Sequence, residues 1–348
     1  MNKQMLLNWL KETNPQRLKE LWQLADETRK KNVGDEVHLR GLLEISNHCI
    51  RRCAYCGINS TQTKIKHYRM TEAEIMECVQ KAVKFGYGTV VIQGGEDYGL
   101  TTEWIANIVQ KIKHETSLAV TLSLGERPFE DLKTWRKAGA DRYLLRFETS
   151  DPKLYKIIHP QVTKTNRDRF AILKELKQLG YEVGSGVMIG IPGQIYASLA
   201  NDIYLFGEMD LDMVGVGPYI PHPNTPLGRG QITFNTNSQE QVPNTEEMTY
   251  KVVALTRLVC PQANTPSTTA LASLNTINGR ELGLVRGANV VMPNITPPIY
   301  RVKYEIYPNK ACLNETAEQC QNCIHARIST IGRTIGKGPG SRNLRPPL

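Results

Sequence analysis

The chain has 348 residues, of which 43 are Lys or Arg and 34 are Asp or Glu, giving a formal net charge of +9. Hydrophobic residues make up 40% and charged residues 22%, which excludes a disordered or fibrous chain. No apolar run approaches the roughly 20 residues of a membrane helix, and the first residues resemble no secretory signal, so we expect a cytoplasmic protein without a membrane partner. The positive charge is spread along the chain, which argues against nucleic acid as a partner.

The predicted elements begin with two amphipathic helices, residues 3–12 and 16–32, and continue as an alternation of strands and helices. The predicted strands are 38–46, 88–94, 119–125, 142–149, 182–190, 213–220, 266–271 and 289–295. The predicted helices between them are 72–85, 102–115, 128–138, 166–179, 195–208, 245–259 and 279–286. This order is typical of parallel strands joined by crossover helices. It favours a complete (β/α)8 TIM-type barrel over an open doubly wound sheet.

We expect three regions: an N-terminal helical cap (1–37), the barrel (38–300), and a C-terminal segment (301–348) that carries three cysteines and a basic tail. The tail beyond residue 329 is rich in Gly, Pro, Arg and Asn, so we expect it to be extended or loosely ordered. The polar stretch 228–244 predicts a long surface loop. In such a barrel the active site lies at the C-terminal ends of the strands.

A cysteine triplet, Cys49, Cys53 and Cys56, directly follows the first predicted strand with the spacing Cys-x3-Cys-x2-Cys. Three thiolates on one loop can bind three irons of a [4Fe–4S] cluster, which leaves the fourth iron open to a small chelating molecule. Zinc is the alternative, but a structural zinc site needs a fourth ligand, and His48 is poorly placed because it adjoins Cys49.

With Tyr55 directly before its third cysteine, this triplet resembles that of the radical S-adenosylmethionine (SAM) superfamily. The resemblance implies that SAM binds the open iron. It also implies that an electron from the reduced cluster cleaves SAM to a 5′-deoxyadenosyl radical, which attacks the substrate. Cys49, Cys53 and Cys56 are then the catalytic metal ligands.

The same resemblance assigns SAM contacts to residues at the ends of several strands. It places the ammonium on the Gly-Gly-Glu turn, the ribose on Glu148 and the carboxylate on Arg169, for which Arg167 is an alternative. The full set is Tyr55, Gly94, Gly95, Glu96, Glu148, Arg169 and Met188. The turn also fits a purely structural role, and Arg146 is a candidate structural ion-pair partner of Glu148.

From about residue 17 to about 325 the chain resembles the HydE family of [FeFe]-hydrogenase maturases, through segments such as ADRYLLRFET and GANVVMPNITPPIYR. The resemblance implies an organometallic substrate, a cysteine-bound iron carbonyl cyanide complex attacked at its sulfur. It also implies other maturation proteins as partners and a reductant such as ferredoxin or flavodoxin. Its substrate-binding positions fall at Gln93, Thr121, Arg142, Thr268, Thr269 and Tyr300. The chain departs from the family at Phe147, where relatives often have His, and at Gly94, where Ser is common.

Other functions stay open. A biotin-synthase-like reaction needs a second, sacrificial cluster held by cysteines on internal strands, and the second to sixth predicted strands contain none. A methylornithine-synthase-like mutase, a non-catalytic iron–sulfur carrier and an RNA-modifying radical enzyme are further alternatives. A carrier needs no SAM pocket, and an RNA-modifying enzyme would need an appended nucleic-acid-binding module, which the sequence does not show.

A second triplet, Cys312, Cys320 and Cys323, follows the predicted barrel. By the HydE resemblance it can bind an additional [2Fe–2S] or [4Fe–4S] cluster. Zinc with His325, or free thiols, are the alternatives. We expect no catalytic role for this triplet.

Overall fold

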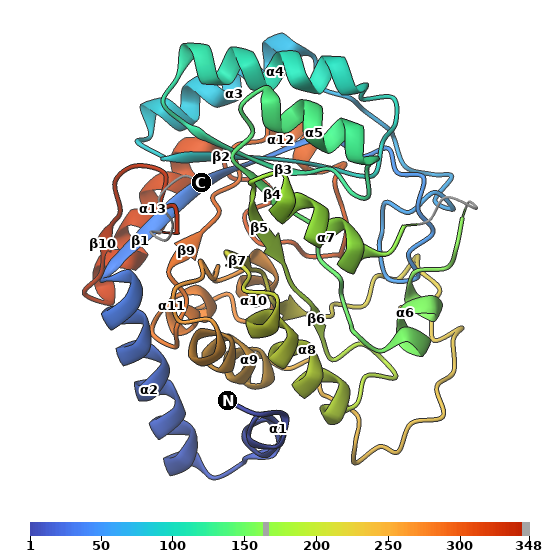
Figure 1. The fold of residues 1–348 in the computed structure, drawn as a ribbon, viewed down its shortest axis with the longest axis vertical. Helices are drawn as coiled ribbons and strands as arrows, with labels where there is room; N and C mark the ends of the chain where they lie inside the picture. Colours follow the sequence, from blue (N-terminus) through green and yellow to red (C-terminus); the bar gives the residue numbers. More distant parts are fainter. Residues whose placement is uncertain (163–166, 343–348) are drawn as a thin grey trace.

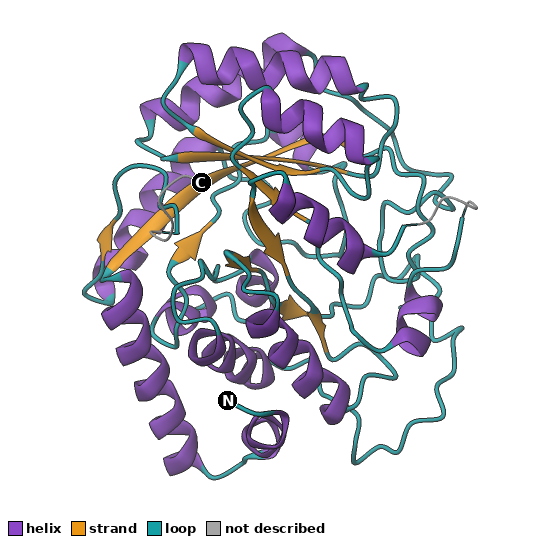
Figure 2. Cartoon of the chain, in the orientation of Figure 1, coloured by secondary structure: helices purple, strands orange, loops and turns teal. Residues whose placement is uncertain are grey.

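The computed structural model describes residues 1–162 and 167–342, with the strands inside a layer of helices (Figure 1, Figure 2). The strands are β1 (Glu36–Ser46), β2 (Thr89–Gly94), β3 (Ala119–Ser123), β4 (Arg142–Leu144), β5 (Glu182–Ser185), β6 (Met188–Ile189), β7 (Met213–Val214), β8 (Gly217–Pro218), β9 (Val290–Val291) and β10 (Thr334–Ile335). The helices are α1 (Lys3–Lys11), α2 (Pro15–Val33), α3 (Glu72–Lys84), α4 (Thr102–Glu115), α5 (Phe129–Lys137), α6 (Pro152–Ile158), α7 (Arg169–Gln178), α8 (Tyr196–Glu208), α9 (Glu246–Val259), α10 (Thr269–Leu274), α11 (Gly279–Leu284), α12 (Pro298–Arg301) and α13 (Ala317–Thr330). No helix among these residues is long and apolar enough to span a membrane.

The helices begin where the sequence carries start signals. Thr71 and Glu74 form a reciprocal capping box at the start of α3, and Pro152 occupies the first turn of α6 after the capping Asp151. Apolar residues spaced along one face of α3 are buried against the sheet. The prediction of an α/β protein with outer helices is therefore confirmed.

The strands form a parallel sheet in the order β10-β1-β2-β3-β4-β5-β7, and β9 also pairs with β1. Between β7 and β9 the pairing is reduced to two isolated bridges, Met213–Asn264 and Pro266–Val290. The predicted strand 266–271 is therefore wrong, because helix α10 begins there. The Thr268 hydroxyl caps this helix by accepting a hydrogen bond from the Leu271 N–H. The described strands form most of a barrel but not eight regular strands.

Four other predicted strands are shorter than expected, among them the last, of which β9 covers only Val290–Val291. β4 ends at Leu144, and the segments 182–190 and 213–220 are each split in two, so that β6 pairs with β8 in a small separate sheet. The break after β5 falls at Gly186, where an added Cβ would lie 1.9 Å from the Gly215 carbonyl oxygen. Only glycine fits this close approach of two backbones.

The two ends of the chain pack against the barrel. Helices α1 and α2 contact α9, and α1 also contacts α8 (Figure 1). After α13, β10 pairs with β1, and the segment that follows reaches the N-terminal ends of the strands, where Arg342 forms ion pairs with Asp210 and Asp212. As far as residue 342 these contacts hold the tail that we expected to be extended or loosely ordered, and residues 343–348 lie outside the described part.

Candidate active site

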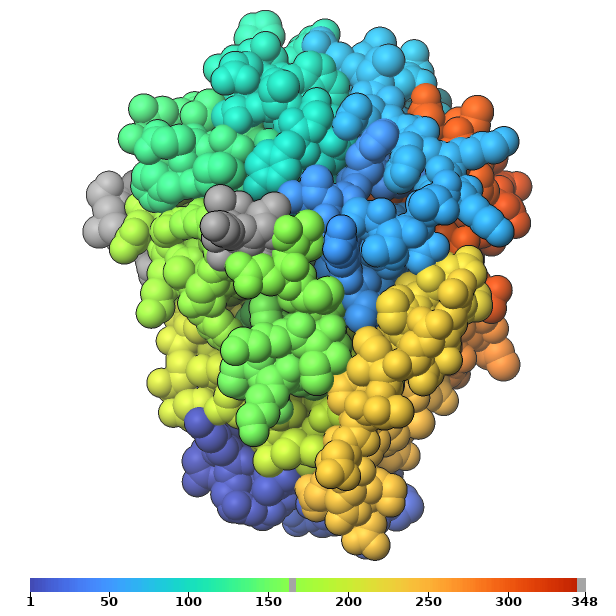
Figure 3. Space-filling model, turned by 90° about the vertical axis from the view of Figure 1, so that its right-hand side faces the viewer, coloured from blue at the N-terminus to red at the C-terminus, as the bar shows by residue number. Residues whose placement is uncertain are grey.

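A cavity with a volume of about 360 Å3 lies inside the sheet. All three cysteines of the first triplet line it, together with residues from β1 to β4, from β6 to β9 and from the segment after α12. The loop that carries the triplet also reaches the face shown in Figure 3, beside α6 and the loop 221–240. Backbone hydrogen bonds from Ala54 to Ile158 and from Leu227 to Ala54 hold the three segments together. This placement agrees with an active site at the C-terminal ends of the strands.

The three thiols are held by neighbouring groups. The Cys49 Sγ accepts a hydrogen bond from the Glu96 N–H at 3.4 Å, and the Cys53 Sγ lies 3.2 Å from the His159 Nδ1. Burial raises the pKa of all three thiols, that of Cys56 to about 12. Among the described residues, no group of three or more His, Cys, Asp or Glu side chains is arranged so that it could hold a single metal ion. The three thiols therefore fit an iron–sulfur cluster, which takes each thiolate on a different iron, better than zinc.

The Gly-Gly-Glu turn lies directly against the cysteine loop. An added Cβ at Gly95 would lie 2.2 Å from the His48 carbonyl oxygen, so this position requires glycine. The buried Glu96 carboxylate is 2.8 Å from Arg51 and accepts a hydrogen bond from the Glu126 N–H. Burial raises the pKa of Glu96 despite the Arg51 cation. The turn therefore presents a buried carboxylate to the cavity.

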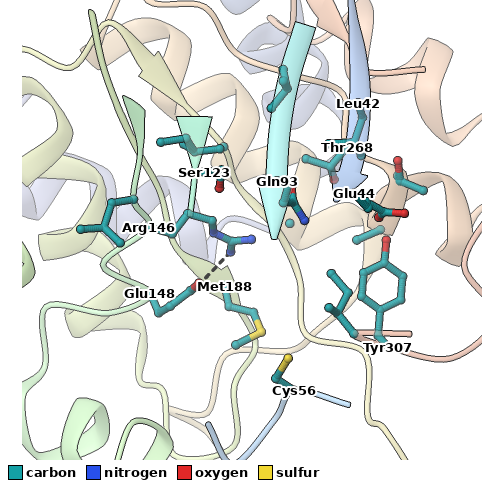
Figure 4. Close-up of a pocket in the computed structure, with 18 of the residues that line it drawn as sticks. Leu42, Glu44, Cys56, Gln93, Ser123, Arg146, Glu148, Met188, Thr268 and Tyr307 are labelled. Carbon is teal, nitrogen blue, oxygen red and sulfur yellow. Dashed lines mark ion pairs between the residues drawn. The ribbon is translucent and has the colours of Figure 1, made fainter. Parts of the chain in front are cut away.

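Arg169 and Glu148 also line the cavity. The Arg169 Nε donates to Glu126 at 2.9 Å, and its pKa is raised because neighbouring acidic groups outweigh the cost of burial. Arg167 instead pairs with Glu175 and does not line the cavity. Glu148 has a left-handed backbone with φ of 65° and pairs with Arg146 at 2.9 Å (Figure 4). Hence the predicted Arg146–Glu148 pair is present.

Met188 and Tyr55 line the same cavity, and Met188 lies beside Glu148 in Figure 4. Phe147 is fully buried against Phe170 and Phe206 and does not line the cavity. Its departure from the family pattern therefore changes the packing behind the site rather than the cavity wall.

Four of the six predicted substrate residues line the cavity: Gln93, Thr121, Thr268 and Thr269. The buried Thr121 hydroxyl has no hydrogen-bond partner among the described residues. Arg142 is misplaced by the prediction, because its guanidinium points to the opposite end of the sheet and binds Glu182, Thr89 and the C-terminal segment. Tyr300 is also outside the cavity, where it donates to Glu74.

Several lining residues were missed by the sequence analysis. Arg40 is 3% exposed and forms no ion pair with a described carboxylate; it donates to the Gly340 carbonyl oxygen and the Met213 sulfur, and its Nε has no partner. Burial lowers its pKa to about 9. Glu44 pairs with Lys310 and accepts from Asn294, and Tyr307 lies nearby (Figure 4). The sequence could have indicated Arg40 and Glu44 as cavity residues, since both are charged residues within an apolar strand. No sequence pattern indicated Lys310 or Tyr307.

The second triplet lies apart from the cavity. Cys320 and Cys323 lie three residues apart on α13, the first buried and the second exposed. A hydrogen bond from the Cys320 thiol lowers the pKa of the Cys312 thiol, aided by the Arg280 cation. The part of the chain that the structure describes shows no zinc-like group that includes His325.

Comparisons with known proteins place the chain in a family. A family model of the radical SAM superfamily matches residues 43–203. The [FeFe] hydrogenase maturase subunit HydE of Thermotoga maritima is 45% identical over 325 residues, covering 92% of this chain and 88% of that protein. A 3-methylornithine synthase of Methanosarcina acetivorans is 29% identical over 79% of this chain and 74% of its own. The crystal structure of a methylornithine synthase has the same fold, with a TM-score of 0.80 at 24% identity over 97% of this chain and 94% of that one.

Proposed function

Because the chain belongs to the radical SAM superfamily and, within it, to the HydE family, we propose that this radical SAM enzyme acts on a small iron complex in [FeFe]-hydrogenase maturation. The family implies a [4Fe–4S] cluster on Cys49, Cys53 and Cys56, and SAM. When bound, the reduced cluster supplies the electron that cleaves SAM to the 5′-deoxyadenosyl radical. The chain itself binds and orients SAM and substrate and keeps water from the cavity.

Three buried charged groups are proposed to hold SAM. The Glu96 carboxylate is aimed at the ammonium, Arg169 at the methionine carboxylate, and Glu148 at the ribose hydroxyls. Each lines the cavity that the triplet lines. Tyr55, Gly94, Gly95 and Met188 supply the walls around them.

One observation carries the substrate assignment: the cavity contains a buried cation, Arg40, whose described partners are a carbonyl oxygen and a thioether sulfur rather than a carboxylate, and a hydroxyl, Thr121, without a described partner. Such groups are costly unless a ligand satisfies them. They suit an anionic ligand with hydrogen-bond acceptors, such as a cysteine-bound iron carbonyl cyanide complex. Gln93, Thr268 and Thr269 add further polar contacts.

The alternatives fit this cavity less well. Its only cysteines among the described residues are those of the first triplet, so it offers no thiol for the sacrificial cluster of a biotin-synthase-like reaction. Lysine, the substrate of a methylornithine-synthase-like mutase, would bring two ammonium groups near Arg40. A carrier would leave Glu96, Glu148 and Arg169 without a function.

We also propose that Cys312, Cys320 and Cys323 hold an additional cluster with a structural role, since they lie outside the cavity. Residues 1–37 and 301–348 are proposed as extensions of the barrel of residues 38–300. The proposed setting is the cytoplasm, where reducing conditions keep the eight free thiols reduced. The proposed partners are other maturases and an electron carrier such as ferredoxin or flavodoxin.

The test is activation of metal-free [FeFe]-hydrogenase in a mixture of the other maturation proteins, SAM and reductant. Hydrogen evolution is expected to depend on this chain and to fall strongly with Arg40→Met, while this variant still cleaves SAM. Activation that is equal with and without the chain would contradict the proposal.

A further inference from the structure

His159 connects two residues of the cluster loop although it lies more than a hundred residues away in sequence. Its Nδ1 is 3.2 Å from the Cys53 Sγ, and its Nε2 is 2.8 Å from the Tyr55 hydroxyl. The imidazole is 9% exposed and stacks on Tyr155, with ring centroids 4.9 Å apart. His159 is the capping residue at the C-terminal end of α6. The cluster loop is bound to the same helix end, because the Ala54 N–H donates a hydrogen bond to the Ile158 carbonyl oxygen.

The chemistry of the loaded site decides the direction of these two hydrogen bonds. A cysteine that binds iron is a thiolate and has no proton to donate. A neutral imidazole has one N–H, so the hydrogen toward Cys53 must come from Nδ1. The Nε2 atom is then an acceptor, which the Tyr55 O–H satisfies. The chain Tyr55–His159–Cys53 therefore directs one N–H donor at a cluster ligand.

We propose that His159 is a positioning residue that tunes the [4Fe–4S] cluster by donating a hydrogen bond from Nδ1 to the Cys53 thiolate, with Tyr55 fixing the tautomer. Hydrogen bonds to the ligand sulfurs help set the potential of such clusters. The donor stabilises the reduced cluster, which carries the extra negative charge, and so raises its midpoint potential. This role does not depend on the identity of the substrate.

The test is an anaerobic redox titration of the reconstituted protein without SAM, followed by electron paramagnetic resonance. His159→Phe keeps a ring against Tyr155 but has no donor, so its midpoint potential should shift downward. The ratio of reduced to oxidised cluster at a fixed potential should fall on the order of tenfold, the scale of one charge-assisted hydrogen bond. His159→Asn keeps an N–H donor and should restore part of the shift.

A second measurement tests the proposal even if the His159→Phe variant incorporates little of the cluster. Pulsed resonance of the wild-type cluster in deuterated water should detect an exchangeable deuteron near Cys53, and Tyr55→Phe should weaken that coupling. Equal potentials in wild type and His159→Phe would overturn the proposal. So would equal shifts in His159→Phe and His159→Asn, which would indicate packing alone, or the absence of an exchangeable deuteron in the wild type.

Discussion

Arg40 and Glu44 lie four residues apart on one face of β1, and both side chains line the cavity (Figure 4 shows Glu44). Glu44 has a partner in Lys310, whereas Arg40 has no described carboxylate partner. Strand β1 therefore contributes to the cavity one carboxylate whose charge is neutralised by Lys310 and one cation, Arg40, whose charge is not neutralised by a carboxylate. This asymmetry is the basis of the proposed preference of the cavity for an anionic ligand.

The first prediction concerns the cysteine triplet. Cys53→Ala should abolish the reductive cleavage of SAM and lower the iron–sulfur absorbance to that of the proposed additional cluster, because the first cluster loses one of three protein ligands. Cys78→Ala is the matched control, since Cys78 is equally buried but lies on α3 outside the cavity. Iron content and release of 5′-deoxyadenosine check both variants. SAM cleavage that persists in Cys53→Ala would refute the metal-ligand assignment.

The second prediction concerns SAM affinity. Glu148→Gln should raise the KM for SAM about tenfold or more, because the proposed hydrogen bonds to the ribose lose their charged acceptor. Glu182→Gln removes a carboxylate that pairs with Arg142 outside the cavity, and it should leave this KM unchanged. An equal KM in Glu148→Gln and wild type would show that Glu148 does not contact SAM.

The third prediction concerns the buried Glu44–Lys310 pair. Lys310→Met should lower the free energy of unfolding by about 3 kcal/mol, because it leaves a buried carboxylate without its cation. The double variant Glu44→Gln/Lys310→Met should lose less than the sum of the single changes. Urea unfolding of the cluster-free protein measures both.

A matched pair on the surface serves as the control for that cycle. Lys111 and Glu72 are each 43% exposed, so Lys111→Met should change the unfolding free energy by less than about 1 kcal/mol. Additive effects at Glu44 and Lys310 would mean that the two charges do not stabilise one another.

Part of this site could be predicted because its signals are local. The Cys-x3-Cys-x2-Cys spacing and the Gly-Gly-Glu turn follow directly from two correctly predicted strands. Arg142 shows why other parts could not be predicted. Strand alternation places it on the face of Arg146, but β4 ends at Leu144, so the two side chains leave in different directions.

Contacts between distant parts of the chain were not predictable from periodicity. Tyr307 and Lys310 enter the cavity from beyond the barrel, and no pattern in the sequence links them to β1. The strand expected at 266–271 was wrong for a different reason. Thr268 caps a helix, a local preference that prevailed over the regular alternation of strands and helices.

The fourth prediction concerns pH. The buried Asp202 carboxyl accepts a hydrogen bond from the Ser150 N–H, and burial raises its pKa to about 7. An unfolded Asp titrates near 3.9, so between about pH 4 and pH 7 the folded protein holds the extra proton. The contribution of Asp202 to stability therefore falls as the pH rises through this window.

Asp202→Asn has no such proton to lose. The Tm of the wild type should therefore fall steadily relative to the Tm of Asp202→Asn as the pH rises from about 4 to about 7. Thermal unfolding at several pH values measures it, and a difference that stays constant over this range would contradict the assignment.

The most direct test of the central claim is anaerobic turnover of the reduced, reconstituted protein with SAM and one of three additions. These are the cysteine-bound iron carbonyl cyanide complex, dethiobiotin and lysine. We predict that only the iron complex stimulates formation of 5′-deoxyadenosine or gives a sulfur-linked adenosyl adduct. A response only to dethiobiotin or to lysine would contradict the account and indicate a different substrate for the same radical chemistry.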